Sequence, residues 1–457
     1  MSPDPPPPPS APLPAATAPV AAVPSATAPA TTGRRAHVVI ALLMTFMALN
    51  FADKAVLGLL ADPIRDDLDL TATEFGAIAS AFYLLFSLSA VLVGFLGNRL
   101  RARPLLAGLV LVWSVAQLPI LLPVAGFAVL LGTRVLLGAG EGPSLPLANH
   151  TAFGWFPQER RSLPAALITV GGALGAVIGA PLVLVINGTL GWRGSFGILG
   201  ALGLLWLLAW WRWGGDGPYA SSADGKAEEA GPRVRVPYRS IFLTGTWLGG
   251  TFSMFAVMWS LALALTWLPT WLEDHVHFSD AQVSGAVGLP SVSGLVLALG
   301  AGVLAQRLLK RGASGRLAQG VVGAVAALAA GVCLLGMTRA GPTALMLPLM
   351  AIGFAAGNAQ TPLTNAAIAR ICPAGQRAAA LATSYAIAAT SSILAPFVSG
   401  RLIDTAANEA AGFDHAFDVA GGLLLAGGLI AVLTVRPDRD AQAIAPEDRQ
   451  PPIVPAS

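Results

Sequence analysis

Runs of about twenty apolar residues recur from position 36 to position 436, and this recurrence limits the fold more than any other feature. A helix needs about 20 apolar residues to cross the hydrocarbon core of a bilayer. In lipid, only helices and closed barrels satisfy all of their backbone hydrogen bonds. Only 11% of the residues are charged, against about 25% in soluble domains. The sequence therefore predicts an all-α integral membrane protein.

The apolar runs predict twelve transmembrane helices. Their approximate bounds are 36–60, 73–97, 104–122, 126–150, 163–187, 194–213, 240–272, 281–306, 316–338, 343–369, 377–403 and 416–436. The run 240–272 is long for one straight helix, so part of it is expected along the membrane interface. Residues 1–35 are rich in Pro, Ala, Ser and Thr, a composition that cannot bury a core and predicts disorder. The tail 437–457 is also expected to be disordered.

A polar stretch at 214–239 separates six predicted spans (36–213) from the other six (240–436), and we interpret it as a cytoplasmic linker. The two parts share short repeats. Pro-Leu-Ala-Asn at 146–149 recurs as Pro-Leu-Thr-Asn at 362–365. This pattern indicates a parallel duplication, which is typical of transporters whose substrate site lies between two halves.

The positions of the basic residues predict the orientation of the spans. With both termini in the cytoplasm, 21 Lys and Arg residues fall in inside segments and 4 in outside segments. Cytoplasmic loops carry such an excess, so we expect a multi-pass protein of the cell membrane. The net charge of +3 does not indicate a nucleic-acid partner, because the basic residues lie in short loops between apolar runs.

Four charged residues lie well inside predicted spans, more than five residues from either end: Asp53, Lys54, Arg134 and Glu141. Such charges usually mark a substrate or ion path. The acids could bind protons and the cations could hold an anion. The alternative is that they form ion pairs that fix helix packing. Asp53 and Lys54 are adjacent and point about 100° apart on a helix, so each is expected to have its partner on another helix.

A resemblance to a known family extends this interpretation. Arg134-x6-Glu141-Gly-Pro-x2-Pro, followed by Trp155-Phe-Pro-x-Glu-Arg-Arg, resembles the fourth-span signature of the major facilitator superfamily. More narrowly, the chain resembles the anion:cation symporters, which include hexuronate, galactonate and phthalate carriers. The resemblance implies the major facilitator fold and proton-coupled import of an organic anion, such as a sugar acid, by alternating access. It also implies that Asp53 and Glu141 carry protons while Lys54 and Arg134 bind the anion.

The sequence departs from the family pattern at three places. Lys54 stands where the family usually has Arg, and Phe86 stands where it often has Tyr. In the loop motif that ends at Arg103, Asn98 replaces the acid that normally pairs across the cytoplasmic gate. Asn98, Arg99 and Arg103 therefore form either a weaker gate, or a loop whose arginines mainly set the topology.

Other polar residues in the spans are weaker candidates. Asn358, Gln360 and Ser391 could bind substrate hydroxyls, and tying helices together explains them equally well. His275 and His277 lie in a predicted external loop beside acids, where a solvated loop explains them better than a metal site. We expect no metal and no cofactor.

Two other functions are considered. Glycines at 171, 172, 175 and 179 loosely resemble the fifth span of drug:proton antiporters, although close helix packing also explains them. The other alternative is a membrane sensor that binds a ligand without transporting it, and it is suggested by the tail 1–35. No hydrolase or phosphate-loop motif is found, so an enzyme is not expected. The expected partners are a small organic anion, protons and the lipid bilayer, and the protein is expected to be a monomer.

Overall fold

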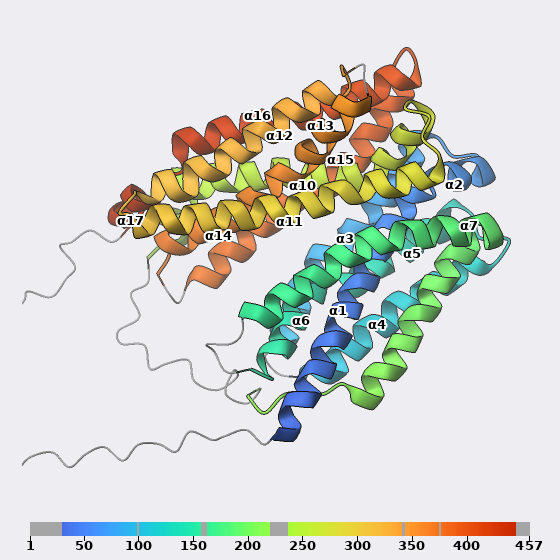
Figure 1. Ribbon diagram of the computed structural model, residues 1–457, viewed down its shortest axis with the longest axis horizontal. Coiled ribbons are helices and arrows are strands. Elements are labelled where there is room, and N and C mark those ends of the chain that lie inside the picture. Colours follow the sequence, from blue (N-terminus) through green and yellow to red (C-terminus); the bar gives the residue numbers. More distant parts are fainter. Residues whose placement is uncertain are drawn as a thin grey trace, which may run out of the picture.

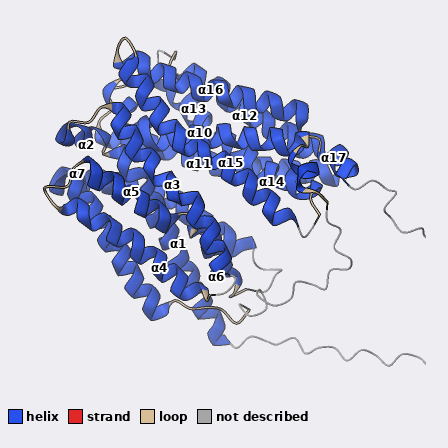
Figure 2. Ribbon diagram, turned by 180° about the vertical axis from the view of Figure 1, so that it is seen from behind, coloured by secondary structure: helices blue, strands red, loops and turns tan. Residues whose placement is uncertain are grey.

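The computed structural model describes residues 30–97, 100–156, 162–219, 236–340, 343–373 and 376–444. Every regular element in this part of the chain is a helix (Figure 2). The helices form two bundles, one from each half of the chain (Figure 1). The first bundle contains α1 (Ala30–Leu59), α2 (Ala61–Leu68), α3 (Ala72–Gly97), α4 (Ala102–Gln117), η1 (Leu118–Leu121), α5 (Phe127–Glu141), α6 (Ser144–Phe153) and α7 (Ser162–Trp213).

The second bundle begins with a short helix and ends with one. It contains α9 (Tyr238–Phe242), α10 (Gly245–Asp274), α11 (Asp280–Lys310), η3 (Arg316–Val321), α12 (Val322–Met337), α13 (Thr343–Ala355), η4 (Ala356–Ala359), α14 (Gln360–Ile371), α15 (Arg377–Thr405), α16 (Glu409–Thr434) and α17 (Pro437–Ile444).

These elements are consistent with the twelve predicted crossings. Nine helices among the described residues are long and apolar enough to cross a membrane. One of them, α7, contains two spans, because Gly191 has a φ of +69° and turns the chain between them. The pair α5–α6 and the series α13–η4–α14 supply the remaining crossings in shorter pieces.

Three sequence-based boundaries differ from the structure. Helix α1 begins at Ala30, inside the tail expected to be disordered, and α17 forms at the start of the tail expected after 436. The long seventh run, which is not expected to form one straight helix, is divided into the short α9 and α10, so that α10 begins at Gly245 and not at position 240. Residues 1–29, 220–235 and 445–457 lie outside the described residues.

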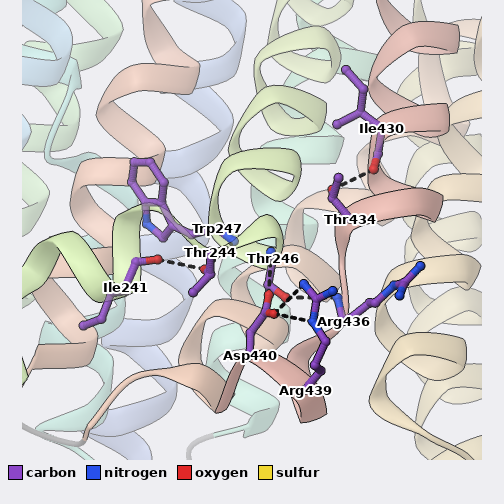
Figure 3. A network of polar contacts seen from close by, with 9 residues as sticks. All are labelled: Ile241, Thr244, Thr246, Trp247, Ile430, Thr434, Arg436, Arg439 and Asp440. Atoms are coloured by element: carbon purple, nitrogen blue, oxygen red, sulfur yellow. Dashed lines mark hydrogen bonds and ion pairs between the residues drawn. The ribbon is translucent and has the colours of Figure 1, made fainter. Parts of the chain in front are cut away.

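Helix α17 is held against the first turn of α10 by a polar network (Figure 3). The Thr246 backbone N–H donates to Asp440 at 2.9 Å, and the Arg436 backbone N–H donates to the Thr246 hydroxyl at 3.0 Å. The Arg439 guanidinium also donates to Asp440. Burial alone would raise the pKa of Asp440, but hydrogen bonds from Thr246 and Arg439 hold it below its ordinary value. Apolar periodicity could not predict this contact, because its members are polar.

The two bundles meet at the end of the molecule where α2 lies and diverge toward α6 and α17 (Figures 1 and 2). Three glycines allow the backbones to touch across the two halves. A Cβ added at Gly58 would lie 2.0 Å from the Leu265 carbonyl oxygen. At Gly76 the distance to the Pro396 oxygen would be 2.4 Å. At Gly400, a Cβ would lie 2.3 Å from the oxygen of Ala72. No side chain fits at these contacts without moving the halves apart.

Glycine also determines how closely α5 approaches α3, and this gives a first test. A Cβ at Gly138 would lie 1.8 Å from the Phe82 oxygen, whereas a Cβ at Gly132 meets nothing within 4 Å. Gly138→Ala is therefore expected to lower the thermal midpoint in detergent by several degrees or to prevent recovery of monodisperse protein. Gly132→Ala is expected to leave the midpoint unchanged or to raise it, since Ala favours a helix interior by up to about 1 kcal/mol. Equal midpoints for the two variants would contradict this packing.

Asp404 links the halves at the α2 end by accepting hydrogen bonds at the start of α3. The backbone N–H groups of Ala72 and Thr73 donate to it at 3.0 and 2.6 Å, and the Thr73 hydroxyl also donates. Hydrogen bonds to a charged group contribute about 1.5–3 kcal/mol. Asp404→Ala is therefore expected to raise the fraction of molecules in which the two bundles are separated at this end by about tenfold or more.

Spin labels can measure this population. Cysteines at Asp69 and Ala407 would carry the labels, in a background in which Cys333 and Cys372 are serine. Asp66→Ala is the matched control, because Asp66 is an exposed acid on α2. A distance distribution for Asp404→Ala that matches the control would show that Asp404 does not hold this end closed.

Candidate functional site

The four charged residues predicted from the sequence lie together inside the first bundle. Helix α1 carries Asp53 and Lys54, and α5 carries Arg134 and Glu141. Asp53 is 1% exposed, Arg134 is 3% exposed and Glu141 is fully buried. Charged side chains are almost never buried without partners, so the contacts of each group indicate what the site can do.

Lys54 is the residue that connects the two helices. Its Nζ lies 3.9 Å from Glu141 Oε2, and it donates to Asn50 Oδ1 at 2.6 Å. The same ammonium lies 4.9 Å from the ring centre of Phe51 and 5.1 Å from that of Phe86. Aromatic faces attract a cation at such distances. Phe86 therefore lies at the site, where it supplies a ring face and no hydroxyl.

Asp53 faces a different helix. Its Oδ1 accepts a hydrogen bond from Gln117 Nε2 of α4 at 3.1 Å. Asp53 and Lys54 therefore have partners on two different helices, as their angular separation on α1 predicts. Asn50 Nδ2 also donates to Ser144 Oγ at 3.3 Å, which ties α1 to the start of α6. The charged residues are thus held by neutral amides as well as by each other.

Hydrogen-bonding capacity remains unused at Arg134 and Glu141. Both carboxylate oxygens of Glu141, and Nε and Nη1 of Arg134, are buried without a hydrogen-bond partner in the described part of the chain. The Arg134 guanidinium lies 5.3 Å from the ring centre of Phe82. A buried charged group with unmet hydrogen bonds destabilises a protein by a few kcal/mol. Such a cost suits a site whose groups exchange partners during function better than it suits a purely structural ion pair.

The close packing of α3 and α5 brings these groups together. Besides Gly138, Gly142 also contacts α3, because a Cβ there would lie 2.0 Å from the Phe86 oxygen. The backbone carbonyls of Phe82 and Phe86 thus touch α5 on either side of Glu141, and their rings lie against Arg134 and Lys54.

The weaker candidates of the second bundle lie elsewhere. Gln360 donates to Thr364 on its own helix, and its Oε1 lies 1.9 Å from the Cβ position of Gly323 on α12. Ser391 is fully buried and donates to the Ala388 carbonyl at 2.7 Å. Asn358 lies beside Gly294 of α11. The structure brings none of the three to the charged residues of the first bundle.

The predicted gate is described only in part. Asn98 and Arg99 lie outside the described residues. Arg103 donates to the Trp211 carbonyl, and its guanidinium lies 5.5 Å from the Trp211 ring centre. Arg103 therefore joins α4 to the end of α7 within one bundle, which favours an anchoring role over a latch between the halves.

The structure places His275 directly after the last turn of α10, and His277 two residues further. The His275 ring packs at 5.0 Å from that of Phe413. No group of three potential metal ligands occurs in the described ranges.

Sequence reasoning missed three residues at the site: Asn50, Gln117 and Tyr83. Asn50 stands one turn before Lys54 on α1, so its position was a readable signal. Gln117 gave a weaker signal, as an amide in an otherwise apolar span. Tyr83 stands three residues before Phe86, and their ring centres lie 6.0 Å apart. A tyrosine ring thus packs against Phe86 of the site, although not at the expected position.

Comparisons with known proteins agree with this architecture. The family described as Major Facilitator Superfamily matches residues 40–361. A hexuronate transporter of Bacillus subtilis is 28% identical over 407 residues, which cover 87% of this chain and 94% of that protein. A D-galactonate transporter of Escherichia coli is 25% identical over 367 residues, covering 75% and 83% of the two chains.

A solved structure shows the same fold at low sequence identity. It is the inward-facing, unoccupied crystal structure of a bacterial homolog of the human lysosomal transporter Spinster. The match has a TM-score of 0.71 and 16% identity, and covers 92% of this chain and 99% of that one.

Proposed function

The chain belongs to the major facilitator superfamily, and on this premise we propose that it imports an organic anion together with protons. The family is one of membrane transporters and not of enzymes. The relatives named above transport a hexuronate and D-galactonate, both sugar acids. The observation that carries the proposal is the unused hydrogen-bonding capacity of buried Arg134 and Glu141, with Lys54 between the acid and the aromatic rings.

Charge balance at the site explains why an anion and a proton would travel together. With Asp53, Lys54, Arg134 and Glu141 all ionised, their formal charges cancel. An anion that enters alone would give this buried site a net negative charge, which is costly in a medium of low dielectric constant. An anion that enters with one proton restores neutrality. Electrostatics then couples anion binding to proton binding, and no separate conformational mechanism is needed to link them.

The contacts suggest separate roles for the two cations. Arg134 has two buried N–H donors free to bind a carboxylate, and charge-assisted hydrogen bonds of this kind are strong. Lys54 is engaged by Glu141, so a proton on Glu141 would release the ammonium toward the anion. Asp53, bonded to Gln117, is the second proton carrier in this scheme. The hydroxyls of a sugar acid would be bound by Tyr83 and Asn50, which contact Phe86 and Lys54 of the site.

The direction of transport rests on the topology. We place both termini in the cytoplasm, as the distribution of basic residues favours. The end closed around Gly58, Gly76 and Gly400 is then the outer end, and the structure represents an inward-facing state of a cell-membrane protein. Rocking of the two bundles about the site would give alternating access.

The drug:proton antiporter is a less favourable alternative. The glycines that suggested it pack α7 against α1, since a Cβ at Gly171 or Gly175 would lie 2.4 or 2.1 Å from the carbonyl oxygens of Met44 and Ala48. Close packing therefore explains them without a motif function. A buried guanidinium at the site also disfavours cationic substrates. Measured flux of any substrate would exclude the sensor.

Purified protein in liposomes that contain a trapped pH dye provides the test. Hexuronates, aldonates and aromatic carboxylates would be added outside one class at a time, with protein-free vesicles as the control. We expect the interior to acidify with one class of acid, because protons enter with the anion. No response to any acid, together with proton release when lipophilic cations are added to acid-loaded vesicles, would support the antiporter and refute the proposal.

A further inference from the structure

A basic cavity of about 1400 Å³ lies at the end of the molecule where α1 and α4 begin and α7 ends. The charged residues that line it are Arg34, Arg35, Arg101, Arg103, Arg212 and Asp216. Among the described residues of the lining, five arginines stand against one acid, which gives this part of the cavity a strong positive charge. It lies apart from the buried site, which is formed by the middle of α1 and by α5. Nothing in the proposed transport mechanism uses it.

The walls of this cavity are fixed by contacts between separate segments. The Trp155 indole N–H donates to the Gly215 carbonyl at 3.0 Å, and the Arg103 backbone N–H donates to Asp216 at 3.1 Å. Asp216, the one acid among the described residues of the lining, thus accepts a backbone hydrogen bond. Arg103 Nε is buried without a partner among the described residues. The cavity is therefore built into the fold and has unused donor capacity.

Aromatic and aliphatic side chains at the rim point to the kind of ligand. Trp213 and Val38 line the cavity and are 57% and 38% exposed, and neighbouring Trp211 is 62% exposed. Exposed tryptophans are typical of the boundary between headgroups and acyl chains. Basic pockets between the cytoplasmic ends of membrane helices bind the phosphates of anionic lipids.

We propose that this cavity binds the phosphate headgroup of an anionic phospholipid, whose acyl chains lie along the exposed apolar residues of α1 and α7. The phosphate would replace water around the arginines. A free phosphate ion has the same charge chemistry but lacks the acyl chains, so the two ligands can be distinguished by experiment.

The test uses the full-length protein in a zwitterionic detergent and measures its thermal midpoint. The probes are short-chain phosphatidylglycerol, short-chain phosphatidylcholine and inorganic phosphate. The test variant is Arg101→Gln/Arg212→Gln, which removes two exposed lining charges. The control variant is Lys310→Gln/Arg311→Gln, which removes two exposed charges at the end of α11 in the other bundle.

We expect saturable stabilisation by phosphatidylglycerol and much weaker effects of the other two probes. The test variant should bind phosphatidylglycerol about tenfold or more weakly at low salt, because each basic residue near the anionic surface contributes substantially to binding. The control variant should bind phosphatidylglycerol as tightly as the unaltered protein does. Without lipid, the test and control variants should have the same thermal midpoint. If inorganic phosphate stabilised the protein as much as phosphatidylglycerol does, the cavity would be a site for free anions and the proposal of a lipid ligand would be refuted. Equal binding by the two variants would refute the cavity as the site.

Discussion

Glu141→Gln is expected to abolish substrate accumulation driven by a proton gradient while leaving substrate exchange between the two sides. Glutamine keeps the size of the side chain but cannot gain or lose a proton. It also removes the negative charge 3.9 Å from Lys54 Nζ, as protonation would. The variant should therefore resemble the permanently protonated carrier, which can bind the anion and reorient but cannot couple its movement to protons.

The experiment compares two assays on the same vesicles. One measures uptake under an imposed pH gradient, and the other measures exchange of labelled for unlabelled substrate without a gradient. Asp66→Asn is the matched control, because it neutralises an exposed acid on α2. Accumulation by Glu141→Gln at the rate of the unaltered protein would remove Glu141 from the coupling role. Loss of both activities at an unchanged thermal midpoint would show that Glu141 is needed for binding or reorientation instead.

The sequence predicted the fold well because the bilayer restricts the alternatives. Each apolar run long enough to cross the membrane becomes helical, although two of them consist of shorter pieces, and the repeat at Pro146 and Pro362 predicted two related halves. The four charged residues were identifiable for the same reason, since charge is costly inside a span. Lys54 and Glu141 do form a contact across two helices.

What the sequence could not predict depends on side-chain direction and on polar contacts between distant segments. Gln360 and Ser391 share the polar character of binding residues, but their hydrogen bonds lie within the second bundle. Arg103 belongs to a motif associated with gating, yet it contacts Trp211 of its own bundle. Helix α17 is held in place by the hydrogen bond between Asp440 and Thr246 at the start of α10. These two residues are 194 positions apart in the sequence. Periodicity carries no information on contacts of this kind.

Replacing Arg134 with glutamine is expected to weaken anion binding by at least about a hundredfold. Loss of a buried charged partner costs about 3–5 kcal/mol in general, and about 1.4 kcal/mol corresponds to a tenfold change in affinity. The variant would also leave Asp53 and Glu141 with Lys54 as their remaining cation at the site. An anion would then meet excess negative charge as well as fewer donors.

Binding of the acid identified in the liposome assay would be measured by titration calorimetry at constant pH, with Arg401→Gln as the control for loss of an exposed arginine. Arg134→Lys separates charge from geometry. If the planar guanidinium holds the carboxylate, the lysine variant should recover only part of the affinity, because an ammonium lacks the rigid set of donors. Full recovery with lysine would show that the charge alone is sufficient. Affinity of Arg134→Gln within threefold of the control would show that Arg134 serves packing through Phe82 and does not bind the anion.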